Sequence, residues 1–464
     1  MLRFLFILLV STTSVYSASN LEDMVTYLAS DALEGRKPGQ PGNELALSYI
    51  EQKLSEANVS GLDNNFRQDF TIFTEMQKLP NTYLKINNNL VNDFEPISFS
   101  LSGELLQKQI AFVGFGITIP KSDTKLNYDD YANIDVNNKV VILMSGDPGI
   151  GNSKSVFRDP DYINYRSLYY KLKNAIEHGA AGVIYINDPL SIADYPIEDA
   201  PYFNSSEGGG NRFSLIVGKT TNKIIDSYLN KLTTKSIQIQ IAKSQKPNSF
   251  LLNHKIDLSV SLKKITGRVS NIVGIVEGVD ETLKREVVVI GAHMDHLGHG
   301  GESSMDPVAD GKIHHGADDN ASGSALVISL AGKIKKMNPK RTFVFVLFNA
   351  EEMGLLGSTY FIDSWARYEE SVGSIVSMYN FDMVGRFDKE LSIMGLGSGI
   401  EWNDLFSKIK LNKNYVLKSD AILSSDHAPF LRKSIPSLFF TTGAHEDYHR
   451  SSDTADKINY NKMH

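Results

Sequence analysis

The stretch Val287-Val288-Val289-Ile290-Gly291-Ala292-His293-Met294-Asp295-His296 indicates the fold class of this chain. Its first four residues are all apolar, as expected of a strand that is buried on both faces of a parallel sheet. Similar apolar runs occur at 342–348, 374–378 and 436–440, and a helical pattern covers 321–335. Strands that alternate with helices predict an α/β fold with a mostly parallel central sheet flanked by helices, from about residue 268 onward.

Histidine and carboxylate side chains follow these apolar runs. His293 follows the first run, Glu351 and Glu352 the second, Asp382 the third, and His449 lies in the loop after the fourth. The loop Gly316-Ala317-Asp318-Asp319-Asn320-Ala321-Ser322-Gly323 adds two more carboxylates. In an open α/β sheet the carboxyl ends of the strands form the ligand crevice. We therefore expect these groups to meet at one edge of the sheet.

Imidazole nitrogen and carboxylate oxygen are zinc ligands, and two zinc ions about 3.5–4 Å apart can share one bridging carboxylate. A further carboxylate must stay unligated, because it takes a proton from the attacking water and passes it to the leaving amine. The adjacent Glu351 and Glu352 suit this division of labour. Each motif alone is more often a surface polar pair, a solvated turn or a helix cap. Their conjunction, each just past an apolar strand, favours a metal centre.

Length and composition narrow the class of protein. The 464 residues are 42% apolar and 22% charged, which is ordinary for a globular protein. The formal net charge of −7 argues against a nucleic-acid binder, since such proteins usually carry a basic excess. No cysteine is present, so disulfides, thiol nucleophiles and cysteine-bound zinc are excluded.

The first eighteen residues read as a secretory signal peptide. Arg3 is followed by the short apolar run 4–10 and by small polar residues that lead to a plausible cleavage site at Ser17-Ala18. The apolar run is too short to span a bilayer, which takes about 20 residues. No other stretch is apolar enough to span. We therefore expect export, to the periplasm or the medium, without a transmembrane helix.

The chain between the predicted signal peptide and the α/β region shows two different sequence patterns. Apolar residues at helical spacing predict helices near 21–28 and 43–57. From about residue 91 to about 255, short strand-like runs alternate with turns, and one helix is expected over 162–178. We therefore predict one domain built from 19–90 and 256–464, interrupted by a β-rich inserted domain over 91–255.

At these residues the chain resembles peptidase family M28, the aminopeptidase Y-like zinc peptidases. The resemblance rests on Gly-Ala-His-Met-Asp-His (291–296), Gly-Ala-Asp-Asp-Asn-Ala-Ser-Gly (316–323), Asn-Ala-Glu-Glu (349–352), Asn-Phe-Asp-Met-Val-Gly (380–385) and Tyr-His-Arg-Ser-Ser-Asp-Thr (448–454). Leu-Ala-Ser-Asp-Ala-Leu-Glu-Gly-Arg (28–36) looks like the N-terminal segment of the family. The insert resembles a protease-associated (PA) domain, with Gly-Ala-Ala-Gly-Val-Ile (179–184) typical of it.

The resemblance implies a role for each residue. His293 and Asp382 would bind one zinc ion, Glu352 and His449 the other, and Asp318 would bridge both. Glu351 would be the general base and acid, and Asp295 would orient His293, as carboxylates near ligating imidazoles usually do. Cobalt or manganese would suit the same ligands. Pocket-lining positions are expected for Asp426 and His427, and loop or outer positions for the remaining imidazoles, His296, His299, His314 and His315. Arg386 would stabilise a charged group or form a plain salt bridge.

The implied activity is the hydrolysis of N-terminal residues from peptides by a water held between two zinc ions. A carboxypeptidase or dipeptidase with the same metal pair, or a glutaminyl cyclase with one metal, remains an alternative. A binding protein without activity is a third hypothesis, and it predicts lost ligands. None of the six core positions has lost its side chain type.

Overall fold

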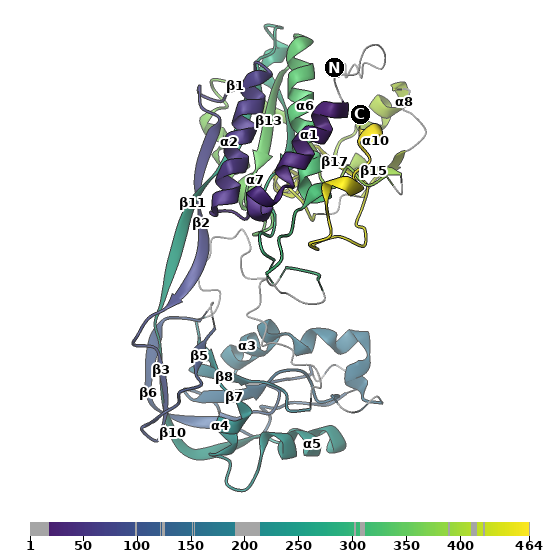
Figure 1. Cartoon of the computed structure of the whole chain (residues 1–464). Helices are drawn as coiled ribbons and strands as arrows, with labels where there is room; N and C mark the ends of the chain where they lie inside the picture. The colour runs from purple at the N-terminus through teal and green to yellow at the C-terminus, as the bar shows by residue number, and fades with distance from the viewer. Residues whose placement is uncertain are drawn as a thin grey trace. The chain divides into compact units, whose positions relative to one another are not determined.

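The computed structural model describes residues 18–463 except 98–99, 121, 123–125, 151, 153, 191–213, 301–302, 307–310, 388–389, 410–414 and 421–422. The predicted signal peptide, residues 1–18, lies outside the described residues except for Ala18, the first residue of helix α1. The chain divides into two compact units (Figure 1). Unit 1 holds the described residues before Thr74 and after Ile265, and unit 2 holds those between them.

The sheet of unit 1 has nine strands, with the order β1-β11-β13-β12-β14-β17-β15-β16 and with β2 paired to β11. Its middle is parallel: β12 (Glu286–His293) lies between β13 (Thr342–Phe348) and β14 (Ser374–Phe381), and β17 (Ser437–Thr441) follows β14. Antiparallel pairs flank this block, formed by β1 (Ser60–Gly61), β11 (Leu262–Val276), β15 (Leu391–Met394) and their neighbours. Strand β16 (Tyr415–Lys418) pairs parallel to β15, and β2 spans Arg67–Lys78. The predicted α/β fold is confirmed, with a parallel centre and mixed edges.

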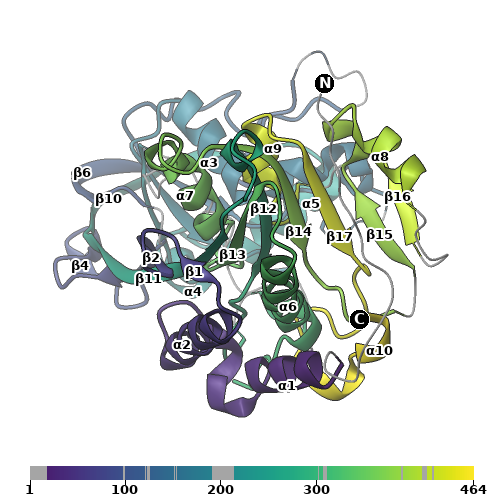
Figure 2. The same cartoon turned by 90° about the horizontal axis from the view of Figure 1, so that it is seen from above.

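The continuous apolar run of β12 is buried on both faces because helices cover both sides of the sheet. Val288 and Ile290 pack in the core that contains residues of α1 (Ala18–Leu28), α2 (Pro41–Glu56) and α6 (Gly323–Lys336). Val287 and Val289 pack in the opposite core, with residues of α7 (Leu356–Ser364) and α9 (Ala428–Arg432). Figure 2 shows these two helix layers on either side of the strands. The short helices α8 (Trp402–Lys408) and α10 (Tyr460–Met463) complete unit 1.

Unit 2 is wider than the predicted insert, because it begins at Thr74 and ends at Ile265. The reason is strand pairing: β10 (Phe250–Val260) pairs with both β3 (Tyr83–Ile86) and β6 (Gly103–Phe112). The sheet order is β4-β3-β10-β6-β7-β8-β9-β5, with β4 (Asn89–Leu90), β5 (Glu95–Pro96), β7 (Val140–Met144), β8 (Gly182–Ile186) and β9 (Ile216–Lys219). Strands β6, β7, β8 and β9 are parallel to one another, so the insert has a parallel α/β centre of its own.

Helices cover both faces of this second sheet. Leu172 and Ala175 of α3 (Leu168–Glu177) share one core with Val141 and Val183, while α4 (Asn222–Asp226) and α5 (Thr234–Ser244) contribute to the other. Helix α3 begins later than the predicted 162–178, because a 3-10 segment, Pro160–Arg166, precedes it. Within the described part of the chain, no helix combines the length and apolar character that a membrane span requires.

Candidate metal centre

The predicted ligands lie at the carboxyl ends of the four parallel strands. His293 is the last residue of β12, Asp382 directly follows β14, and Glu352 follows β13 after a short turn. His449 lies in the loop after β17, and the segment Ala317–Ser322 ahead of α6 supplies the aspartates. Neighbouring parallel strands end at the same edge of a sheet, which brings residues from distant parts of the sequence together.

One group of ligand atoms centres on His293. Its Nε2 lies 3.2 Å from Asp319 Oδ1 and 3.4 Å from Asp382 Oδ1. His293, Asp319 and Asp382 each offer one ligand atom within 4.8 Å of the others, and all three residues are buried. Asp382 Oδ1 is buried and has no hydrogen-bond partner among the described residues. A buried carboxylate oxygen without a partner is costly unless a cation meets it, so this donor set fits a divalent metal ion.

A second group centres on Glu352. His449 Nε2 lies 3.3 Å from Glu352 Oε2 and 3.3 Å from Asp319 Oδ2. His296 Nδ1 lies 2.9 Å from Glu352 Oε1, and His296, Asp319 and Glu352 also offer ligand atoms within 4.8 Å of one another. Asp319 therefore belongs to both groups, with one carboxylate oxygen toward His293 and the other toward His449. This is the geometry that a bridging carboxylate requires.

The structure places Asp319, and not the predicted bridge Asp318, between the two ligand groups. Its Oδ1 accepts a hydrogen bond from Gly385 N at 2.6 Å, and its Oδ2 lies 3.2 Å from His445 Nε2. The Asp318 carboxylate thus faces residues outside both ligand groups, while its neighbour Asp319 faces the histidines. Two adjacent aspartates are indistinguishable by residue type, and the backbone of the loop decides which one turns inward. The Asp319–Asn320 peptide bond in this loop is cis.

Asp295 is fully buried and holds the Glu351–Glu352 turn as well as His293. Its Oδ1 accepts from Glu351 N at 3.1 Å and its Oδ2 from Glu352 N at 3.3 Å. His293 Nδ1 lies 3.2 Å from the Asp295 carbonyl oxygen and 4.0 Å from Asp295 Oδ1. Burial raises the pKa of Asp295 to about 6. The predicted orienting contact to His293 therefore runs mainly through the backbone carbonyl, and the carboxylate positions the two glutamates.

The pKa values of Glu351 and Glu352 are shifted in opposite directions. Burial raises the pKa of Glu351 well above its usual value, and the charge of Glu352 adds to this effect. Burial and the Asp319 charge would also raise the pKa of Glu352, but hydrogen bonds from His296 and His449 outweigh them and lower it to about 2. A carboxylate with a raised pKa is suited to take up a proton near neutral pH, whereas an ionised one is suited to hold a cation.

The same carboxylates raise the pKa values of His293 and His449. Burial alone would lower the pKa of His449, but hydrogen bonds to Asp319 and Glu352 raise it to about 11. Burial likewise opposes the charges of Asp382 and Glu351, which raise the pKa of His293 well above its usual value. In the metal-free protein both imidazoles therefore hold protons at neutral pH. A metal ion has to displace these protons, since only neutral imidazole is a ligand.

Left-handed backbone occurs in three of the turns that carry these residues. Ala350, Met383 and His449 have φ angles of 57°, 57° and 54°. Non-glycine residues adopt this conformation at a cost, and they persist in it where surrounding contacts over-determine it, often at functional sites. The turns that carry Glu351 and Glu352, Asp382 and His449 are therefore held in place by their surroundings.

Asp453, which the sequence did not single out, supports the bridging loop. Its Oδ2 accepts from Asp318 N at 2.8 Å and from Asp319 N at 3.1 Å. Its Oδ1 lies 3.1 Å from Arg386 Nη2, which also lies 2.8 Å from Asp447 Oδ2. Of the two roles considered for Arg386, the structure supports the salt bridge.

The remaining predicted residues lie around the two ligand groups. Asp426 is fully buried, and burial raises its pKa to about 7. The ring of His427 stacks on Phe439 with centroids 4.6 Å apart. His314 contacts Ser304 and His315 contacts Asp31, at 2.7 and 2.8 Å. His299 contacts the Gly311 carbonyl oxygen. His296 alone among these outer imidazoles contacts a predicted ligand.

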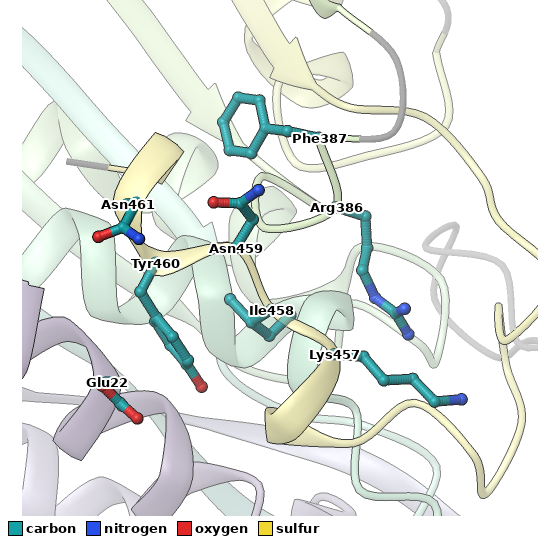
Figure 3. A pocket seen from close by; sticks show the side chains of 8 residues that line it. All are labelled: Glu22, Arg386, Phe387, Lys457, Ile458, Asn459, Tyr460 and Asn461. Atoms are coloured by element: carbon teal, nitrogen blue, oxygen red, sulfur yellow. The ribbon is translucent and has the colours of Figure 1, made fainter.

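A cavity of about 380 Å³ lies beside Arg386 (Figure 3). Glu22 of α1 and Phe387, which follows Arg386, also line it, together with residues of the C-terminal segment: Lys457, Ile458, Asn459, Tyr460 and Asn461. None of the predicted metal ligands lines it. We therefore do not assign this cavity to the substrate.

Residues 271–464 match peptidase family M28. Aminopeptidase YwaD of Bacillus subtilis is 24% identical over 364 residues, which cover 75% of this chain and 64% of that protein. Leucine aminopeptidase 2 of Trichophyton equinum is 24% identical over 46% of each chain. The chain thus spans less than two thirds of the length of these curated relatives.

Two solved structures share the fold. A zinc aminopeptidase from Bacillus subtilis, BSAP, superposes with a TM-score of 0.55 at 19% identity, covering 97% of this chain and 93% of that one. An aminopeptidase from Aneurinibacillus sp. strain AM-1 gives 0.54 at 21% identity, covering 96% and 90%. The chain therefore carries, in residues 271–464, a domain of peptidase family M28.

Proposed function

We propose that this protein is a zinc-dependent aminopeptidase with two zinc ions. The observation that carries the proposal is the split of the Asp319 carboxylate, whose oxygens lie 3.2 Å from His293 Nε2 and 3.3 Å from His449 Nε2. His293 and Asp382 would hold one ion, Glu352 and His449 the other, and Asp319 would bridge them in place of Asp318. The relatives named above are aminopeptidases, and BSAP is described as a zinc enzyme, which supports this assignment.

When bound, the two ions would lower the pKa of a water molecule between them and polarise the substrate carbonyl. The residues of the chain supply proton transfer and orientation. Glu351 lies next to a proposed ligand but in neither ligand group, so its carboxylate is free to take the proton of the water. It can then deliver that proton to the leaving amine. Asp295 fixes the backbone of this turn throughout.

A substrate with a free N-terminus suits the proposed site. The charge of two zinc ions would offset the carboxylates of Asp319, Glu352 and Asp382, so a neutral α-amino nitrogen would be held as a ligand of one ion. A carboxypeptidase would instead need a cation for the substrate carboxylate. Two arginines described near the site are already engaged, since Arg386 pairs with Asp447 and Asp453 and Arg36 donates to backbone carbonyl groups. This favours an aminopeptidase over that alternative.

The proposal is tested with aminoacyl-p-nitroanilides and matched N-acetylated substrates. We expect hydrolysis of the free amines only, complete loss with a chelator, and recovery with added zinc. Comparable hydrolysis of N-blocked peptides would favour an endopeptidase or carboxypeptidase. Cyclisation of N-terminal glutamine with one zinc per chain would favour the cyclase.

We also propose that the chain is exported by cleavage after its N-terminal signal and that unit 2 is a PA-like domain. The signal proposal rests on the composition of residues 1–18. N-terminal sequencing of the protein recovered from a periplasmic or culture fraction tests it, and an intact Met1 there would contradict it.

A further inference from the structure

We propose that Arg36 is a positioning residue of the metal centre and that it acts through a short N-terminal strap, residues 31–43. This inference rests on the proposed function, because it concerns the affinity of the proposed zinc ligands. The strap lies outside residues 271–464, which match family M28. The centre would therefore depend on a segment that is distant in sequence from every ligand.

Arg36 is 1% exposed, and its guanidinium donates only to backbone carbonyl groups. Its Nε donates to Met294 O at 2.8 Å, and Met294 directly follows the ligand His293. Its Nη1 donates to His315 O at 2.8 Å and its Nη2 to Gly316 O at 2.9 Å. A further bond from Nη1 reaches Leu28 O at the end of α1.

The carbonyls of Met294, His315 and Gly316 belong to the two segments that carry His293 and Asp319. One planar cation therefore joins the exit of β12 to the loop that leads into the bridging aspartate. Arginine offers five N–H donors in a fixed fork, which lysine and glutamine cannot reproduce. A buried guanidinium bound to carbonyls on both segments fixes their separation, and with it the distance between the two ligands.

Asn43 extends the strap to the third ligand segment. Its Nδ2 donates to Arg36 O at 2.9 Å and to Asn349 Oδ1 at 3.1 Å, and Asn349 Nδ2 donates back to Asn43 Oδ1 at 2.9 Å. Asn349 follows β13 and precedes the Glu351–Glu352 turn. Both asparagines are buried, and each satisfies part of the hydrogen bonding of the other.

The backbone of the strap is held in a costly conformation. Glu34, Gly35 and Arg36 have φ angles of 46°, 69° and 53°, three left-handed residues in succession. A Cβ atom at Gly35 would lie 2.5 Å from His314 O and 2.6 Å from Gly298 O, so the strap passes directly against the chain between β12 and the bridging loop. Such a turn persists only when its contacts compensate its strain.

The test measures the zinc dissociation constant of the folded full-length protein by competition with a chromophoric chelator. We expect Arg36→Lys to bind zinc about 10–100-fold more weakly than wild type, the range for loss of an outer partner of a metal ligand. Asn43→Ala, the second variant, should weaken zinc binding in the same direction. Lysine keeps the positive charge but lacks the forked donors of the guanidinium. Weaker zinc binding by Arg36→Lys would therefore assign the loss of affinity to the geometry of these hydrogen bonds.

The matched control is Leu47→Ala. Leu47 lies on α2, is 2% exposed, and packs in the core that contains α1, α2 and α6. The substitution should lower the thermal stability of the metal-free protein and leave the zinc affinity at the wild-type value. If both strap variants bind zinc within about threefold of wild type, or if Leu47→Ala is weakened as much as they are, the strap is only structural. A wild-type protein that binds no zinc would instead overturn the proposed function.

Discussion

Substitution of Asp319 and of Asp318 by asparagine separates the bridging aspartate from its neighbour. Asparagine keeps the shape of the side chain but loses its charge and replaces one oxygen by an amide nitrogen, which is a donor. In Asp319→Asn, one of the two ligand groups therefore loses its shared oxygen. In Asp318→Asn, the remaining oxygen can still accept from Gly385 N, and only the contact with His445 is lost.

The magnitude follows from the contacts. Asp319 lies 3.2 Å from His293 Nε2 and 3.3 Å from His449 Nε2, and each such charge-assisted contact contributes about 1.5–3 kcal/mol. Because asparagine keeps one oxygen, Asp319→Asn loses one of these two charged oxygens, which amounts to about 1.5–3 kcal/mol and corresponds to roughly 10–100-fold in zinc affinity. For Asp318→Asn we expect a loss of zinc affinity of less than about tenfold, because Asp318 contacts neither ligand group.

The assay is zinc competition with a chromophoric chelator, followed by kcat/KM on leucine p-nitroanilide at saturating zinc. Far-UV circular dichroism and thermal unfolding of both variants confirm that they are folded. The reasoning would be refuted if Asp318→Asn lost zinc as strongly as Asp319→Asn, or if Asp319→Asn bound zinc as wild type does.

Four further outcomes are expected. Glu351→Gln should keep both zinc ions and lose about 10²–10⁴-fold in kcat, the usual contribution of a general base, and a loss of zinc instead would make it a ligand. Zinc affinity should rise between about pH 6 and pH 8, by up to about tenfold per pH unit for each proton displaced, because the pKa of His449 is raised to about 11 and its bound proton competes with the metal. Dissociation constants measured across this pH range check the sign of the change. A zinc affinity that does not vary with pH would contradict the prediction. Asp453→Ala should leave the buried backbone amides of Asp318 and Asp319 without an acceptor and lower the free energy of unfolding by about 2–6 kcal/mol. Urea denaturation measures this change. A decrease below about 1 kcal/mol would refute the role of Asp453 in supporting the bridging loop. Removal of zinc should lower the thermal midpoint, since zinc at 100 times its dissociation constant stabilises the folded state by about 2.7 kcal/mol, and calorimetry with and without chelator measures this.

The sequence predicted the parallel centre of unit 1 and most of its site, because both depend on local patterns. A continuous apolar run such as 287–290 marks a strand that is buried on both faces, and the polar residue that follows it lies at the sheet edge by topology alone. His293, Glu352, Asp382 and His449 were found in this way, and the structure brings all four together.

The features that the sequence missed depend on long-range polar contacts. The second helix was expected to begin near Asn43, yet α2 begins at Pro41 with Gln40 as its N-cap, and Asn43 pairs with Asn349, 306 residues away. Arg36 reaches Met294 over 258 residues, and no local pattern indicates either partner. The choice between Asp318 and Asp319 likewise depends on loop backbone conformation, which residue type does not encode. The boundaries of unit 2 were missed because β3 and β10 pair across most of the insert.

The central claim is a two-zinc centre that removes N-terminal residues. The most direct measurement is the zinc content of the purified protein by mass spectrometry, taken together with hydrolysis of aminoacyl-p-nitroanilides before chelation, after chelation and after stepwise return of zinc. We predict two zinc ions per chain and activity on free amines that falls to background with chelator and returns as zinc is restored. Activity that survives complete removal of metal, or a fully active protein with no bound zinc, would contradict the account.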